Sequence, residues 1–167
     1  MQTIGYDLRQ SKLSEKELCS MKIAFSHVNL VSRDWRALAD FYIHVFDCIE
    51  KPPARDLKGP WVDRLTGLKD THIQGIHLTL PGSNGQTLEI FSYQKSRQNQ
   101  TKEINLEGFG HIAFAVENVQ VCVERLLAQG GSLVGEVIDT DIEGVGHISV
   151  VYARDPEGNI IELQRWS

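Results

Sequence analysis

The sequence predicts an α+β protein built from two copies of one strand–helix–strand–strand–strand unit. The first observation behind this prediction is an internal repeat, because FSHVNLVSRDWRALADFY at 25–42 aligns without a gap to FGHIAFAVENVQVCVERLL at 109–127. The second is that His27 falls on His111, a displacement of 84 residues (111 − 27). The third is that each half ends in a hairpin pattern whose last strand carries a glutamate.

Each copy begins with a strand and continues into a helix. The Phe-x-His motif opens an apolar, β-branched-rich run that favours a strand. Asp34 and Asn118 then stand at equivalent places and are good N-caps for the helix. Apolar residues recur behind these caps at helical spacing and are predicted to face the core: Trp35, Leu38, Ala39, Tyr42 and Phe46 in the first copy, and Val119, Cys122, Val123, Leu126 and Leu127 in the second.

The rest of the first half is predicted to hold three strands. A strand is expected near 48–51, followed by an irregular stretch from Pro52 to Asp70. The segment THIQGIHLTLPGSNGQTLEIFSY at 71–93 then alternates apolar and polar residues on both sides of Pro81-Gly82-Ser83-Asn84-Gly85. This pattern predicts a hairpin with its turn at 81–85.

The rest of the second half follows the same plan. Gly130-Gly131 is predicted to stop the helix, and a strand is expected over 132–138. The segment GHISVVYARDPEGNIIELQ at 146–164 is predicted to form the last hairpin. Its turn is Asp155-Pro156-Glu157-Gly158-Asn159, since Pro, Gly and Asn suit the backbone angles of turns.

These patterns divide the chain into four segments. We predict an N-terminal arm at 1–22, a first module at 23–93, a polar linker at 94–107 and a second module at 108–167. The arm has little core pattern beyond a capping box formed by Ser14 and Glu17.

Composition excludes several classes of protein. The chain has 167 residues, of which 41% are hydrophobic and 23% charged, which is typical of a globular protein. With a net charge of −5 and no basic cluster, it is not expected to bind nucleic acid. No apolar run is long enough for a membrane span. The widely spaced Cys19, Cys48 and Cys122 fit reduced thiols rather than a disulfide framework, so a cytoplasmic location is predicted.

Glu162 is a carboxylate in a strand where apolar residues are expected. It shares its face with Ile160 and Gln164, and Glu89 ends the first half in the same way. With His27 and His111, the two halves supply two imidazoles and two carboxylates, which suit a divalent cation such as Zn, Ni, Co, Mn or Fe. From spacing alone, the alternative stays open that each His merely begins a strand and each Glu is solvated.

These segments, together with LEIFSY at 88–93 and DPEGNIIEL at 155–163, resemble the vicinal oxygen chelate superfamily. This superfamily includes glyoxalase I, methylmalonyl-CoA epimerase, fosfomycin-resistance proteins, bleomycin-binding proteins and extradiol dioxygenases. The resemblance covers about residues 23–165. It implies a glyoxalase-like fold, in which two tandem βαβββ modules form a half-open mixed sheet cup around one metal ion. The ligands carried over to this chain are His27, Glu89, His111 and Glu162.

A set of two His and two Glu most resembles glyoxalase I and the methylmalonyl-CoA epimerase group. The resemblance therefore implies a metal-dependent lyase or isomerase that uses Zn, Ni or Co, or else Mn or Fe. Glu162 is implied as the base that moves a carbon-bound proton, with Glu89 as its counterpart. The expected substrate is a thiol adduct, a thioester or an α-hydroxycarbonyl. The alternatives are a methylmalonyl-CoA-type epimerase, a non-catalytic drug-binding resistance protein and an extradiol-type dioxygenase.

Other polar residues receive weaker interpretations. His77 and His147 are interpreted as ordinary strand histidines, because neither joins the repeated ligand pattern, and His44 and His72 have less claim still. Four basic residues are candidates for holding the anionic end of glutathione or coenzyme A, although surface solvation is the preferred interpretation: Arg33, Arg36, Lys51 and Arg55. We expect a homodimer. The superfamily closes its cup within one chain or across a dimer, and both arrangements remain open here.

Overall fold

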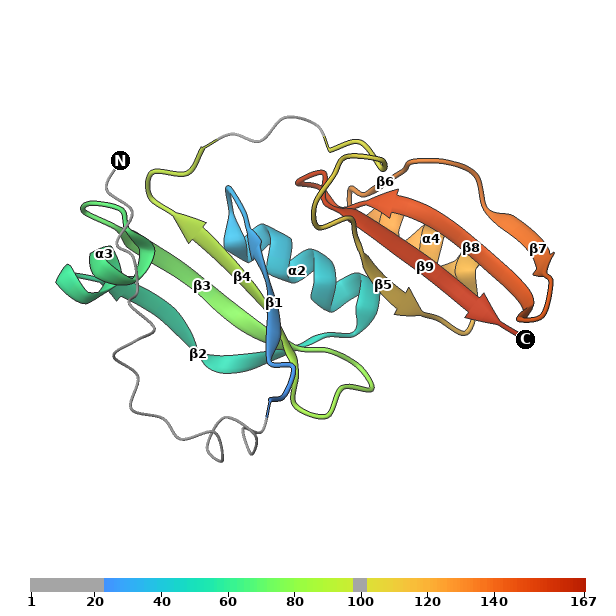
Figure 1. The fold of residues 1–167 in the computed structure, drawn as a ribbon, viewed down its shortest axis with the longest axis horizontal. Helices are drawn as coiled ribbons and strands as arrows, with labels where there is room; N and C mark the ends of the chain where they lie inside the picture. Colours follow the sequence, from blue (N-terminus) through green and yellow to red (C-terminus); the bar gives the residue numbers. More distant parts are fainter. Residues whose placement is uncertain (1–22, 98–101) are drawn as a thin grey trace, which may run out of the picture.

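Two β-sheets with helices packed on them make up the protein, as the α+β prediction requires (Figure 1). The computed structural model describes residues 23–97 and 102–167. The predicted arm at 1–22, with Ser14 and Glu17, lies outside the described residues. Within those residues, none of the helices has the length and apolar character that crossing a bilayer needs.

The first sheet has strand order β1-β4-β3-β2. β1 pairs in parallel with β4, and the other neighbours are antiparallel. The elements of this half are β1 (His27–Val31), α2 (Trp35–Phe46), β2 (Ile49–Lys58), α3 (Pro60–Thr66), β3 (His72–Thr79) and β4 (Thr87–Tyr93).

The second sheet repeats this plan with order β5-β9-β8-β6, and β7 also pairs with β8. β5 runs parallel to β9, whereas β8 is antiparallel to its partners. The elements are β5 (Ile112–Ala115), α4 (Val119–Ala128), β6 (Ser132–Leu133), β7 (Ile138–Ile142), β8 (Gly146–Arg154) and β9 (Ile160–Trp166). In both sheets the parallel strand, β1 or β5, lies at an edge.

Both predicted helices begin at their predicted caps. The Asp34 side chain accepts hydrogen bonds from the backbone N–H groups of Arg36 and Ala37, and the Asn118 side chain accepts one from Val121. The predicted core stripes are buried with one exception. Leu127 is 47% exposed, so its assignment to the core was wrong. Leu126 fills that place, and the next residue lies about 100° further round the helix.

Two predicted segments differ from the structure. The stretch predicted as irregular, Pro52–Asp70, holds most of β2 and all of α3. The strand continues past Pro52-Pro53 because β2 is an edge strand with a register shift between Lys51 and Arg55, where missing N–H donors are tolerated. The strand predicted over 132–138 is instead broken into β6 and β7, with Gly135 in the loop between them.

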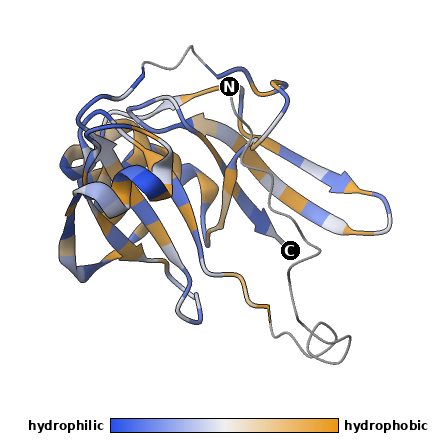
Figure 2. Cartoon of the chain, turned by 60° about the vertical axis from the view of Figure 1, so that its left-hand side comes forward, coloured by the Kyte–Doolittle hydropathy of each residue, from blue (hydrophilic) through white to orange (hydrophobic). Residues whose placement is uncertain are grey.

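One hydrophobic core joins the two halves through α2 and α4. The rings of Phe46 and Phe114 stack with centroids 3.9 Å apart, and buried Tyr42 donates a hydrogen bond to Asp155 over 3.0 Å. Each large apolar side chain fully buried here contributes about 1.5–3 kcal/mol. Apolar and polar residues alternate along the strands in Figure 2, which is the pattern of sheets with one face on a core. The two sheets are therefore held in fixed positions.

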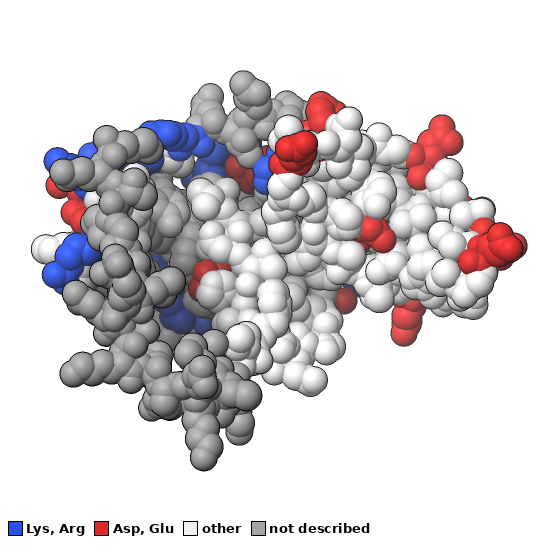
Figure 3. Space-filling view, viewed as in Figure 1, with Lys and Arg blue, Asp and Glu red and all other residues white. Residues whose placement is uncertain are grey.

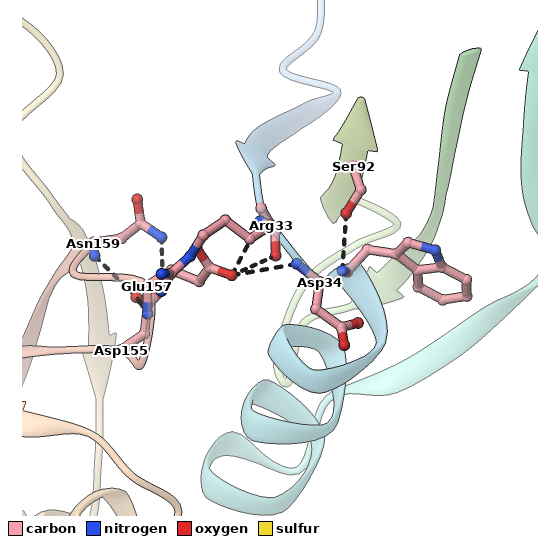
Figure 4. Close-up of polar contacts among 8 residues, drawn as sticks. Arg33, Asp34, Ser92, Asp155, Glu157 and Asn159 are labelled. Carbon is pink, nitrogen blue, oxygen red and sulfur yellow. Dashed lines mark hydrogen bonds and ion pairs between the residues drawn. The ribbon is translucent and has the colours of Figure 1, made fainter. Parts of the chain in front are cut away.

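The turn 155–159 adds a polar clamp between the halves (Figure 4). The Glu157 carboxylate accepts hydrogen bonds from the Ser32 hydroxyl, from the backbone N–H groups of Arg33 and Asp34, and from Arg33 Nε at 2.9 Å. Asp155 holds the turn itself by accepting from the backbone N–H groups of Glu157 and Asn159. Glu157 thus fastens the second half to the N-terminal end of α2.

Candidate metal centre

The first predicted ligand pair lies on two adjacent parallel strands. His27 begins β1 and Glu89 lies in the middle of β4, with His27 Nε2 3.3 Å from Glu89 Oε2. Asn29, directly paired with Glu89 in the sheet, donates from Nδ2 to the same oxygen over 3.3 Å. The Glu89 side chain is only 12% exposed. The sequence therefore folds so that one imidazole and one largely buried carboxylate meet.

The second pair repeats this arrangement in the other sheet. His111 precedes β5 and Glu162 lies in β9, with His111 Nε2 3.0 Å from Glu162 Oε2. The Glu162 side chain is 14% exposed. Tyr152 of β8 lies directly opposite Glu162, and its ring centroid is 5.2 Å from that of His111. Burial and the adjacent Glu162 carboxylate raise the pKa of Tyr152.

Both pairs occupy the sheet face opposite the helix. The strand neighbours of Glu89 and Glu162 turn the other way and are completely buried against the core: Leu88, Ile90, Ile161 and Leu163. Because side chains alternate along a strand, the two glutamates point away from that core. Each half thus presents its ligand pair on its open face.

Sequence analysis missed a third contact of Glu89. His77 Nε2 lies 2.9 Å from Glu89 Oε1, whereas His27 contacts the other oxygen, Oε2, and the two imidazole rings lie edge to face with centroids 6.2 Å apart. The signal that could have revealed it is the hairpin register, since the turn at 81–85 places His77 directly opposite Glu89. Tyr152 holds the corresponding place opposite Glu162.

The remaining histidines have their polar contacts outside the two His–Glu pairs. His72 Nε2 lies 2.7 Å from Asp56, and His147 Nδ1 lies 2.9 Å from Asp141. His44 contacts the backbone oxygen of Asp40, one helical turn away, over 2.7 Å. These contacts agree with the interpretation of the three residues as ordinary structural or surface histidines.

Comparison with known families supports the resemblance. The model of the Glyoxalase/Bleomycin resistance protein/Dioxygenase superfamily matches residues 24–163, most of the chain. The protein belongs to this superfamily. The recognition of the vicinal oxygen chelate superfamily from sequence is confirmed, as is the glyoxalase-like fold. No curated protein matches the chain significantly.

Solved structures of this superfamily share the fold. A glyoxalase family protein from Bacillus cereus is 22% identical, with a TM-score of 0.76 over 88% of this chain and 97% of that one. The fosfomycin resistance protein FosX from Listeria monocytogenes is 19% identical, with a TM-score of 0.59 over 88% of this chain and 94% of that one. A glyoxylase/bleomycin resistance protein/dioxygenase domain from Frankia sp. EAN1pec is 21% identical, with a TM-score of 0.57 over 88% and 100%. At these identities the likeness establishes the fold alone.

Members of the superfamily generally use a divalent metal ion, and the ligand pairs of this chain fit one. Two atoms bound at about 2.1 Å from the same ion lie about 3.0–3.4 Å apart, and the two N–O distances of 3.3 and 3.0 Å fall in that range. Imidazole and carboxylate are also the donors that such ions accept in proteins. Each pair is therefore suited to be half of a metal site.

The structure does not gather all four predicted ligands within one chain. Among residues 23–97 and 102–167, no group of three or more ligand-type side chains is placed to hold one ion. His27 and Glu89 belong to the first sheet, and His111 and Glu162 to the second. Within the described residues the two His–Glu pairs are therefore separate, and the role of the four residues as a single metal centre stays a prediction.

The four basic residues considered as candidates for binding an anionic substrate group divide into two groups. Arg33 is bound to Glu157, and the Arg36 guanidinium lies 4.2 Å from the ring centroid of Trp35, so both are engaged in the fold. Lys51 pairs directly with His77, and Arg55 pairs with Gly75 on the same strand β3. Paired residues share a face, so both cations flank the open face that carries Glu89.

Proposed function

We propose that this protein is a divalent-metal-dependent lyase or isomerase of the glyoxalase I type, with His27, Glu89, His111 and Glu162 as metal ligands. The observation that supports the proposal is the presence of two His–Glu pairs at equivalent places in the repeat, with N–O distances of 3.3 and 3.0 Å. Superfamilies with one fold carry many reactions, so the argument depends on these side chains and their geometry rather than on the fold.

A second copy of the chain completes the site in this proposal. The edge strands β1 and β5, beside the two half-sites, have no sheet neighbour on their outer side among the described strands. The phenylalanines of the two Phe-x-His motifs, Phe25 and Phe109, are 66% and 68% exposed, although residues of this kind are normally covered. Two-fold symmetry would bring the first half of each chain against the second half of its partner. The dimer then has two complete sites.

The chemistry follows from two carboxylates in different surroundings. A divalent ion bound by these residues would supply Lewis acidity toward two adjacent substrate oxygens. Glu89 has three polar side chains around it, namely His27, Asn29 and His77, and serves as a fixed ligand. Glu162 acts as the base that takes a carbon-bound proton of the substrate and returns it to the neighbouring carbon. The product therefore contains the same atoms as the substrate, which makes the reaction an isomerisation.

An anionic group on the substrate is also part of the proposal. Lys51 and Arg55 flank the Glu89 half-site, whereas the second half, residues 108–167, has three basic residues against nine acidic ones, a formal charge of −6. In the face seen in Figure 3, basic side chains gather over the first half and acidic ones dominate the end formed by the second. A carboxylate or phosphate of the substrate would therefore be held by the first half.

Metal content and a substrate panel test the proposal. The full-length protein, loaded in turn with Ni²⁺, Zn²⁺ and Co²⁺, is assayed with methylglyoxal plus glutathione, with methylmalonyl-CoA and with fosfomycin. We expect turnover with the first substrate pair. Glu162→Gln should lower kcat at least about 100-fold, in the range lost when a general base is removed. Glu143→Gln, at an exposed acidic residue of the turn before β8, is the control and should leave activity unchanged.

Two results would overturn the proposal. If the wild-type protein binds no divalent ion, the assigned ligands are wrong. If it binds one but acts only on methylmalonyl-CoA or fosfomycin, the metal site stands and the glyoxalase I assignment falls.

A further inference from the structure

His77 of β3 is held from both sides of its ring. Its Nε2 lies 2.9 Å from Glu89 Oε1, and its Nδ1 lies 3.1 Å from the Thr87 hydroxyl. Thr87 and Glu89 are both in β4, on the face that also carries His77. The His77 side chain is 18% exposed and the Thr87 residue is buried. The ring therefore lies between two fixed partners of the neighbouring strand.

The chemistry of these partners fixes the tautomer of His77. An ionised carboxylate only accepts hydrogen bonds, so the proton of the neutral ring is on Nε2 and points to Glu89. Nδ1 is then an acceptor, and the Thr87 hydroxyl donates to it. The result is a directed chain of hydrogen bonds from Thr87 through His77 to Glu89.

These hydrogen bonds leave one oxygen of Glu89 for the open site. Oε1 is engaged by His77, whereas Oε2 faces His27 and Asn29, each at 3.3 Å. Because the two oxygens of a carboxylate lie in one plane with fixed separation, holding Oε1 also sets the direction of Oε2. The His77 ring is edge-on to the His27 ring, with centroids 6.2 Å apart, but the two imidazoles contact different oxygens of Glu89. Among the described residues, no group of three or more ligand-type side chains is placed to hold one ion.

We propose that His77 is a positioning residue, which orients Glu89 so that Oε2 alone is presented to the metal ion. The proposal rests on the proposed function, because it gives His77 a role only if Glu89 is a ligand. A partner that orients a metal ligand in this way typically contributes 10- to 100-fold in metal affinity or activity, at about that order of magnitude.

Three variants of the full chain test the role. His77→Leu removes both hydrogen bonds and keeps an apolar side chain in the strand. His77→Gln can still donate to Glu89 and accept from Thr87, so it is the conservative variant. His72→Gln is the matched control, since His72 lies in the same strand and contacts a carboxylate, Asp56, outside the site.

The first measurement is the Kd for Ni²⁺ by competition with a chelator, with circular dichroism to verify folding. We expect His77→Leu to bind roughly 10- to 100-fold more weakly than wild type, as loss of an orienting partner does. His77→Gln should recover most of this affinity, and His72→Gln should bind like wild type. Equal affinity of His77→Leu and wild type would overturn the proposal, as would a His77→Gln protein as weak as His77→Leu.

A second measurement keeps the proposal testable if His77→Leu does not fold. The ¹⁵N chemical shifts of the His77 ring in the metal-free wild-type protein report its tautomer, and we expect the proton on Nε2. A proton on Nδ1 would overturn the inference while leaving the proposed function intact. A wild-type protein that takes up no divalent ion would overturn both, so the two failures are distinguishable.

Discussion

At the scale of single residues, the neighbours of a polar group decide its role. Ionised carboxylates are costly to remove from water unless donors compensate, and Glu89 has His27, Asn29 and His77 around it. The identities of Glu89 and Glu162 as candidates could be inferred from sequence, because both stand at the end of a repeat. The contact of His77 could not, since it follows from strand register rather than from the repeat.

Cys48 gives a prediction at this scale. Burial and the neighbouring Asp47 carboxylate raise the pKa of its thiol to about 12, so the reactive thiolate is scarce at pH 8. We expect Cys48 to be inert toward a disulfide reagent such as DTNB in the folded protein and to react fully in guanidinium chloride. The measurement uses a Cys19→Ser background and follows the thionitrobenzoate released from DTNB against time.

The control for this experiment is Cys48→Ala in the same background. Cys122 is buried too, and burial raises the pKa of its thiol. The folded control should therefore also fail to react with DTNB. Fast release of one thiolate from folded protein, absent in Cys48→Ala, would contradict the prediction.

At the scale of elements, local patterns predicted local structure well. The caps at Asp34 and Asn118 and the turn at 155–159 follow from the hydrogen-bonding and backbone preferences of a few adjacent residues. The same reasoning missed α3 and the continuation of β2, because these depend on packing across the sheet. Val62 of α3, for example, is buried against Ile73 and Phe91 of two other strands.

Glu157 gives the prediction at this scale. Burial alone would raise the pKa of its carboxyl, but hydrogen bonds from Arg33, Ser32 and two backbone N–H groups outweigh burial and lower the pKa below its ordinary value of 4.5. The folded state therefore favours the ionised form. The stabilisation by this group is fully present above the ordinary pKa and is lost as pH falls through the lower, folded-state pKa.

We therefore expect Glu157→Gln to lower the free energy of unfolding by about 2 kcal/mol at pH 7, the scale of hydrogen bonds to a charged group. The difference from wild type should shrink as pH falls below 4.5. Urea unfolding of both proteins at several pH values measures it, with exposed Glu143→Gln as the control. A difference that stays constant from pH 7 to below pH 4.5 would show that the charge of Glu157 is irrelevant.

At the scale of the whole molecule, the arrangement of the halves decides where a complete site can form. The shared core of α2 and α4, together with the Glu157 clamp, keeps the two ligand pairs on separate sheets of one chain. Sequence predicted two equivalent halves but not this outcome. An internal repeat is equally compatible with a site inside one chain or between two, and only the packing of the halves distinguishes them.

A mixture of two inactive chains tests the shared site. In the proposed dimer, each site takes its first pair from one chain and its second pair from the other. A heterodimer of Glu89→Gln and Glu162→Gln chains thus has one site with both changes and one with neither. Equal amounts of the two chains, exchanged at random, should recover about a quarter of wild-type activity and metal content, since half of the dimers are mixed and each has one intact site.

Each variant refolded alone is the control and should stay inactive. The same mixture prepared without subunit exchange should also stay inactive, which separates complementation from the simple addition of two weak enzymes. If every site lay within a single chain, each chain in the mixture would keep its own defect, and exchange would restore nothing. Recovery only after exchange would therefore require two copies at each site, because neither chain alone then has all four unmodified ligands.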